Sequence, residues 1–145
     1  MKKLNKKGFT LVELLAVIII LALLMVVVAT TALPAMGKAR ENSLRVYAQR
    51  LQDKAKERYM ADIKTGTWIY PVTDLTGETQ QYKGYVVVNS DTTGNIVATV
   101  YVADVKNHIG ISNQSVVTDS TSVESNVTDS QINDIYGAYT TITES

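Results

Sequence analysis

The chain has no cysteine, one histidine and two prolines in 145 residues. Without cysteine it can have no disulfide framework, no thiolate nucleophile and no cysteine-ligated metal site. The single histidine, His108, lies close to Asn107 and Gly110 and is typical of a loop. No glycine-rich phosphate loop or metal-ligand motif accompanies it. The composition therefore predicts a protein that is not an enzyme and needs no cofactor and no metal.

Charge is missing from one long stretch near the start of the chain. Between Phe9 and Gly37 the only ionisable side chain is Glu13. Residues 14–33 alone form a run of about 20 residues, enough to cross a bilayer as a helix. The leader before this stretch holds no acid and four lysines: Lys2, Lys3, Lys6 and Lys7. Lysines beside a span hold that end in the cytoplasm, so the sequence predicts a single-pass segment with the remainder outside.

Three other interpretations of this stretch compete. A secretory signal peptide has an apolar region of about 7–15 residues and a small-residue cleavage site, and this run is longer and has no clean site. A plain membrane anchor accounts for the lysines and the length but does not need Glu13. It remains open, because a carboxylate near the cytoplasmic end costs less than one at the helix centre. A buried helix of a soluble protein would need other apolar segments around it.

Residues 8–15, which read GFTLVELL, resemble the N-terminal signature of type IV pilins and pseudopilins. The close resemblance covers about the first 35 residues and is one of architecture beyond them. It implies that a prepilin peptidase cuts between Gly8 and Phe9 and N-methylates Phe9. Glu13 then becomes the fifth residue of the mature chain, where the family keeps a glutamate. The implied partners are other copies of the chain, the peptidase, an assembly platform protein, an ATPase and, before assembly, the membrane.

The residue types at this signature suit such processing. Gly8 lets an extended backbone enter a protease site with no side chain in the way. Cleavage creates an amine on Phe9, and among bundled apolar helices Glu13 would be a buried charge that needs a partner. The amine of a neighbouring copy would supply that partner and fix the axial register. We therefore predict that Phe9 and Glu13 act in assembly.

Residues 38–63 predict an amphipathic helix behind the apolar run, and Pro34 and Gly37 are expected to break the helix between the two. Gly66 is a plausible stop. One apolar stripe follows three- and four-residue steps: Leu44, Tyr47, Ala48, Leu51, Ala55, Tyr59 and Ile63. The charged residues off that stripe are interpreted as a solvated face. The predicted organisation is a leader (1–8), an apolar transmembrane and assembly helix (9–36), a stem helix (37–64) and a head (65–145).

The sequence of the head, residues 65–145, predicts one small antiparallel sheet. Residues 82–89 and 96–105 are rich in Val and Tyr, and turn-forming residues separate them, so they should form a hairpin. Residues 67–70 are a strand or loop candidate, and residues 74–81 a polar connection. One face of the hairpin should cover the helix stripe. The predicted class is α+β, a long N-terminal helix with an apolar half and an amphipathic half packed on a small antiparallel head.

Residues 112–134 are biased, with 18 polar or acidic side chains among 23 residues and no Lys or Arg. They predict an exposed, mobile loop region. A capping box from Thr128 to Gln131 and helical spacing up to Tyr139 favour a short helix, and residues 140–143 could be a last strand. Four acids in or near the loop could collect calcium, but solvated acids are favoured: Asp119, Glu124, Asp129 and Asp134.

Charge divides unevenly along the chain. Residues 1–64 hold 12 basic and 5 acidic side chains, whereas residues 65–145 hold 2 and 9. Basic stems could therefore attract the acidic heads of neighbouring copies. A direct nucleic-acid partner is disfavoured, because an exposed surface that binds DNA should be basic.

The sequence as a whole predicts a bacterial prepilin stored in the cell membrane and polymerised into a surface type IV pilus. The resemblance implies the activities of such fimbriae, cell adhesion and twitching motility. A pseudopilin of a type II secretion or DNA-uptake machine, or a membrane-tethered adhesive minor subunit, are the alternatives. Because cysteine-free relatives often come from Gram-positive bacteria, a Gram-positive source is expected.

Overall fold

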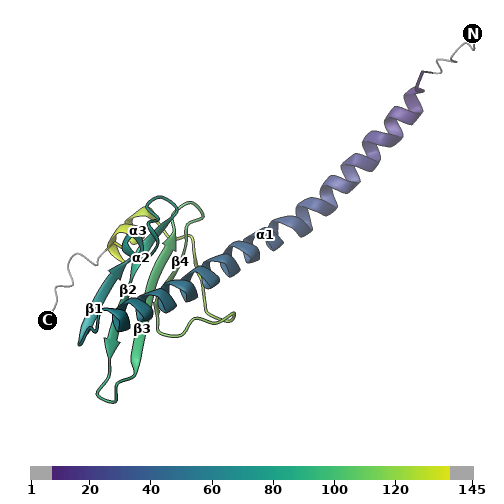
Figure 1. Cartoon of the computed structure of the whole chain (residues 1–145). Coiled ribbons are helices and arrows are strands. Elements are labelled where there is room, and N and C mark those ends of the chain that lie inside the picture. Colours follow the sequence, from purple (N-terminus) through teal and green to yellow (C-terminus); the bar gives the residue numbers. More distant parts are fainter. Residues whose placement is uncertain (1–7, 138–145) are drawn as a thin grey trace, which may run out of the picture. The chain divides into compact units, whose positions relative to one another are not determined.

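The computed structural model describes residues 8–137. The chain falls into two compact units, residues 1–38 and 39–145. One helix, α1 (Leu11–Ala61), runs through both (Figure 1). In the first unit the apolar part of α1 is the only helix or strand among the described residues, while the second holds the rest of α1, a sheet and two short helices.

The helix does not break at Pro34 and Gly37, so the expected interruption is wrong for this structure. Proline removes one hydrogen bond, the one its nitrogen would donate to the carbonyl of Thr30. In the turn before that gap, the hydroxyls of Thr30 and Thr31 donate to the carbonyl of Val27 at 3.0 and 2.9 Å, so both polar side chains are satisfied within the helix. A helix flanked by intact turns tolerates one missing bond, as membrane-spanning helices often do.

The sheet is an antiparallel meander in which each strand pairs with the next along the chain. Its strands are β1 (Thr67–Pro71), β2 (Tyr82–Ser90), β3 (Ile96–Asp104), β4 (Ile109–Gln114) and β5 (Glu124–Ser125). The helix α2 (Val72–Thr76) connects β1 to β2, and the helix α3 (Asp129–Asp134) follows β5. The α+β class and the hairpin of β2 and β3 are confirmed, and α2 occupies part of the predicted polar connection.

The amphipathic part of α1 packs on one face of the sheet. Its buried apolar side chains are Leu44, Ala48, Leu51, Ala55 and Tyr59. They meet Val86 and Val88 of β2 and Val100 and Val102 of β3 in one core. The predicted stripe is confirmed up to Tyr59 and fails at its last member. Ile63 is 86 % exposed, because α1 has already ended and the φ of Ile63 is +50°.

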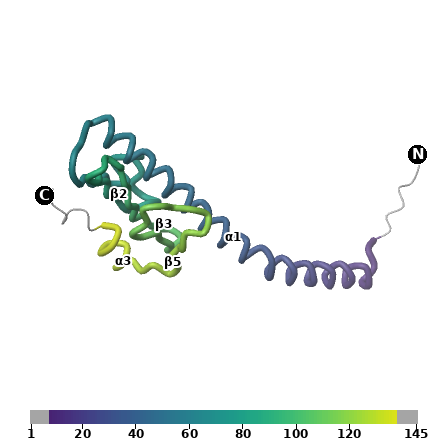
Figure 2. The backbone as a smooth tube through the Cα atoms, turned by 90° about the horizontal axis from the view of Figure 1, so that it is seen from below, coloured from purple at the N-terminus to yellow at the C-terminus, as the bar shows by residue number. Residues whose placement is uncertain are grey.

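The opposite face of the sheet carries α3. Ala103 is buried with Ile132 and Tyr136 in a second cluster, while its neighbour Val102 faces α1. Side chains alternate along a strand, so α1 and α3 lie on opposite faces of the sheet (Figure 2). The capping box predicted for α3 is confirmed, with reciprocal bonds between Thr128 and Gln131. Tyr139 and the possible strand at 140–143 lie outside the described residues.

Residues 112–134 contain more regular structure than the loop region that the sequence predicted, although most of their side chains are exposed as expected. They include the end of β4, all of β5 and α3, and the buried side chains of Val117, Thr121 and Val127. The segment contributes single apolar side chains, separated by polar ones, to the two hydrophobic clusters. Such isolated contacts leave no periodic pattern for a sequence to show.

A row of polar side chains on α1 holds the first part of this segment. Arg45 Nε donates to the carbonyl of Thr121 at 2.7 Å, and Gln49 Nε2 to that of Val117 at 3.0 Å. Gln52 is 5 % exposed and its Nε2 donates to two carbonyls, those of Ala98 at 2.7 Å and Gln114 at 2.8 Å. We name Arg45, Gln49 and Gln52 the carbonyl row. It supplies donors to backbone oxygens of β3, of the end of β4 and of the loop that follows β4.

Two basic residues of α1 also bind backbone oxygens, at the end of α2. Arg58 Nη1 lies 3.0 Å from the carbonyl oxygen of Asp74, and Lys54 Nζ lies 3.4 Å from that of Leu75. Cations favour the carboxyl end of a helix, where carbonyls lack intrahelical partners. These two charges are therefore not merely solvated, as the sequence had suggested.

Asp91 organises the turn between β2 and β3. Its Oδ1 accepts hydrogen bonds from the hydroxyl of Thr93 at 2.6 Å and from the backbone N–H groups of Thr93 and Asn95 at 2.9 and 2.8 Å. The hydroxyl of Thr93, followed by the N–H of Asn95, lowers the pKa of Asp91 from 3.8 to about 2. These bonds are made to the charged form and hold the turn closed.

This carboxylate predicts a pH dependence of stability. Because its folded pKa is depressed, its contribution is complete above the unfolded value of 3.8 and is lost as the pH falls through about 2. Asp91→Asn should therefore lower the melting temperature above pH 4 and make little difference near pH 2. Thermal unfolding of the full chain in detergent across this range measures it. Asp119→Asn is the matched control, and equal pH profiles for the two variants would contradict the assignment.

Candidate functional site

The predicted cleavage point precedes α1 and is open. Gly8, Phe9 and Thr10 belong to no helix or strand, and Phe9 is 92 % exposed. A Cβ added to Gly8 would meet nothing within 4 Å. The fold of the chain therefore does not require glycine at this position. Any requirement for Gly8 must come from what binds the segment, which fits recognition by a protease.

Glu13 is already engaged at the start of α1. Its Oε2 accepts hydrogen bonds from the backbone N–H of Thr10 at 2.8 Å and from the Thr10 hydroxyl at 3.1 Å. In return the Thr10 hydroxyl oxygen accepts from the N–H of Glu13 at 3.2 Å. This reciprocal pair is a capping box, with Thr10 at the N-cap and Glu13 three residues on. The negative charge also complements the positive end of the helix dipole.

Thr10 is the functional residue that sequence reasoning missed. The signal was present, since Thr10 and Glu13 have the spacing of a capping box ahead of an apolar run. Both bonds from Thr10 reach Oε2, and Oε1 makes no hydrogen bond within residues 8–137. One carboxylate oxygen thus holds the cap while the other can accept a second donor.

The surface of α1 after this box is apolar on every side. From Leu11 to Met36 all large apolar side chains are more than half exposed. This helix is long and apolar enough to cross a membrane, by length and composition. Leaving so many apolar side chains in water would cost on the order of tens of kcal/mol, at about 1.5–3 kcal/mol each. The segment therefore needs lipid or other apolar helices around it.

Within residues 39–137 the candidate histidine and acids do not come together in one cluster. His108 is exposed, and its Nδ1 lies 2.9 Å from the carbonyl oxygen of Val127. Across residues 8–137, no group of three or more His, Asp or Glu side chains could hold a metal ion. Glu124, one of the acids considered for calcium, accepts hydrogen bonds from the hydroxyls of Ser112 and Tyr136. Burial, reinforced by the charge of Glu124, raises the pKa of Tyr136 to about 12.

Comparison with known proteins identifies the N-terminal part of the chain alone. No curated protein and no solved structure matches the chain significantly, and nothing supports the expected Gram-positive source. The sequence model described as the prokaryotic N-terminal methylation motif matches residues 3–29. That match spans Gly8, Phe9 and the Thr10–Glu13 box, and it points to a structural, pilin-like subunit. Residues 3–29 therefore carry the N-terminal methylation motif that is the signature of type IV prepilins.

Proposed function

We propose that this chain is a structural subunit of an extracellular type IV pilus. It is made as a membrane-anchored prepilin, cut after Gly8, N-methylated on Phe9 and polymerised through α1. The apolar surface from Leu11 to Met36 carries the proposal, because it is bare on every side in the single chain. Lipid covers that surface in the precursor and the same helix of other copies covers it in the filament.

The capping box supports a role for Glu13 in polymerisation. Removal of the leader leaves Thr10 in place, so the box can hold Glu13 in the mature chain. Its Oε1 can then accept the amine of Phe9 from a neighbouring copy. Since an unpaired charge among apolar helices is costly, a copy that docks one step out of register is rejected. Thr10 thus positions the Glu13 carboxylate to bind the amine of Phe9 from the next copy.

The proposed partners follow from this life cycle. The prepilin peptidase would act on the exposed Gly8–Phe9 peptide, and a platform protein and an ATPase would extract the subunit from the membrane. Adhesion and twitching motility are functions that the assembled filament would serve. The second unit, with its acidic surface, would face outward and meet surfaces or cells.

A pseudopilin of a secretion or DNA-uptake machine is the second candidate, because the same apolar helix and capping box would serve its shorter filament. Filament length on cells separates the two, since a pilus extends well beyond the envelope. A membrane-tethered adhesive subunit is a third candidate. It would remain a minor component of any filament or would not polymerise.

The deciding experiment is intact mass and N-terminal sequencing of the protein from its native cells. We expect sheared surface material to contain a chain that begins at N-methylated Phe9. A chain that keeps its leader and stays in the membrane fraction would overturn the proposal and leave an anchored head. Electron microscopy of the same sheared material then measures filament length.

A further inference from the structure

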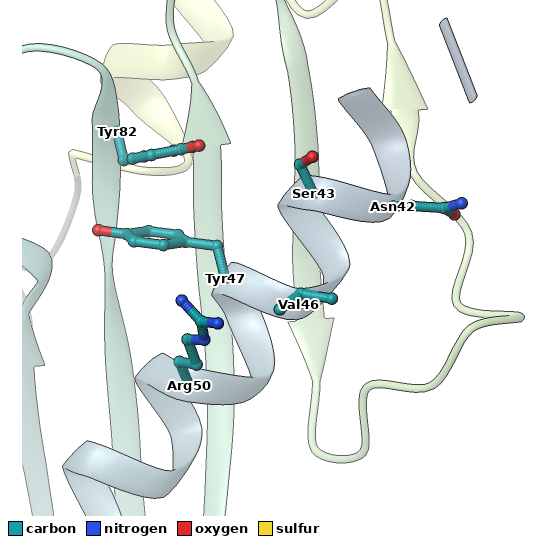
Figure 3. A pocket seen from close by; sticks show the side chains of 6 residues that line it. All are labelled: Asn42, Ser43, Val46, Tyr47, Arg50 and Tyr82. Atoms are coloured by element: carbon teal, nitrogen blue, oxygen red, sulfur yellow. The ribbon is translucent and has the colours of Figure 1, made fainter. Parts of the chain in front are cut away.

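The second unit has a groove along α1 that polymerisation through the apolar helix does not use. One hollow of about 400 Å³ is lined by Asn42, Ser43, Val46, Tyr47, Arg50 and Tyr82 (Figure 3). A second hollow of about 270 Å³ shares Ser43 and Tyr82 with it and adds Arg40. We name the two together the stem groove.

The walls of the stem groove are held in place by contacts within the unit. The rings of Tyr47 on α1 and Tyr82 on β2 stack with centroids 3.9 Å apart and an interplanar angle of 20°. The hydroxyl of Tyr47 also lies 3.3 Å from that of Thr76. The groove is thus formed before anything binds, which lowers the ordering cost of binding.

The stem groove is basic. Arg40 and Arg50 are exposed, and the sole ion pair within residues 8–137 joins two other residues, Arg45 and Glu41. Arg40 and Arg50 are ten positions apart, which is about 15 Å of rise along a helix. The one acid of the groove, Asp104, is buried, and its carboxylate accepts two hydrogen bonds from Asn107. The groove therefore favours an acidic occupant.

The same chain offers such an occupant on its other face. Asp129 and Asp134 lie at the two ends of α3, and both are exposed. Lys83 reaches α3 but donates to Asn133 at 2.7 Å rather than to a carboxylate. Residues 65–137 carry eight acids and two lysines, so this part of the chain has a net negative charge. We name Asp129, Ser130 and Asp134 the α3 edge.

We propose that the stem groove of one copy receives the α3 edge of the next copy in the filament. This inference rests on the proposed function and names a contact between heads that the apolar helices leave unspecified. The groove and α3 lie on opposite faces of the sheet, so the contact joins two different surfaces. A contact of that kind does not close on itself as a two-fold dimer does, and it propagates as an open chain of subunits.

The absence of native cysteine allows a direct test by cross-linking. Val46→Cys places a thiol in the stem groove and Ser130→Cys one on the α3 edge, and both changes leave the charges intact. In sheared filaments of the double variant, a short bismaleimide should give a ladder of dimers, trimers and longer species. Each single-cysteine variant is the matched control and should give no ladder. Filaments that form normally but give no ladder would overturn the contact.

Charge reversal tests the same contact by a different readout. Arg50→Glu should reduce sheared filament protein about tenfold, and Asp129→Arg should do the same, while the two together should restore the yield. Lys106→Glu makes the same charge change outside the groove and should have no effect. Wild-type yield from Arg50→Glu, or no recovery in the double variant, contradicts the pairing. Absence of filaments in the wild type would instead contradict the proposed function.

Discussion

Glu13→Val is expected to leave the cut after Gly8 intact and to abolish filaments. The valine fits an apolar bundle, but the amine of Phe9 from the neighbouring copy then has no partner. Removing one member of a buried ion pair costs about 3–5 kcal/mol, and this cost recurs at every subunit. At about 1.4 kcal/mol per tenfold, assembly should fall by a hundredfold or more. The measurement is sheared filament protein, with N-terminal sequencing of the membrane pool.

Two further variants separate the charge of Glu13 from its cap. Glu13→Gln can still form a capping box with Thr10 but carries no charge. Thr10→Ala keeps the charge and removes the cap, at a cost of about 0.5–2 kcal/mol. We expect Glu13→Gln to resemble Glu13→Val and Thr10→Ala to assemble weakly. Normal filaments from Glu13→Val would refute the pairing, and normal filaments from Glu13→Gln would assign the role of Glu13 to the cap.

Gly84→Ala is expected to destabilise the second unit strongly. Gly84 lies opposite Val102 in the pairing of β2 with β3, and its φ is +153°. An added Cβ would lie 2.0 Å from the carbonyl oxygen of Tyr101 and 2.8 Å from the Cα of Val102. Both atoms are backbone in the middle of the sheet, so no side chain can turn away. We expect a loss of about 3 kcal/mol or more, against a total stability of about 5–15 kcal/mol.

A second glycine provides the control for Gly84. Gly94, in the turn between β2 and β3, has a φ of +86°, and an added Cβ there meets nothing within 4 Å. Gly94→Ala should show the cost of backbone strain alone, roughly 1–2 kcal/mol. Thermal unfolding of both full-length variants in detergent compares the two costs. If Gly84→Ala melts no lower than Gly94→Ala, the close approach of the two strands is not what fixes glycine at this position.

Where a pattern is local and periodic, the sequence was sufficient to predict the structure. The stripe on α1 recurs every three or four residues, and the hairpin of β2 and β3 alternates around a turn rich in Asp, Thr and Gly. The capping box at Thr128 needs only two residues at a fixed spacing. Each of these signals lies within one element, so no knowledge of distant contacts was needed.

What the sequence did not predict depends on contacts between distant segments. β5 is two residues long and pairs with β4, and β4 is held by its pairing with β3 and by Gln52 of the carbonyl row, more than sixty residues away in sequence. Continuity through Pro34 is a local exception, because it depends on the helical turns on either side of the proline. In the candidate site, Gly8, Phe9 and Glu13 came from a motif, and the spacing of Thr10 and Glu13 could have predicted the capping box that the hydrogen bonds show.

The carbonyl row has a consequence for how this surface can vary. The hydrogen bonds that its three side chains donate to the neighbouring strands and loop all reach main-chain oxygens, and every amino acid has such an oxygen. The exposed side chains of that loop, such as those of Asp119 and Ser120, can therefore be exchanged without loosening its path. Substitutions at these exposed positions would therefore change the surface of the molecule and leave the backbone path of the loop unchanged. The same loop would accept a short foreign peptide for display.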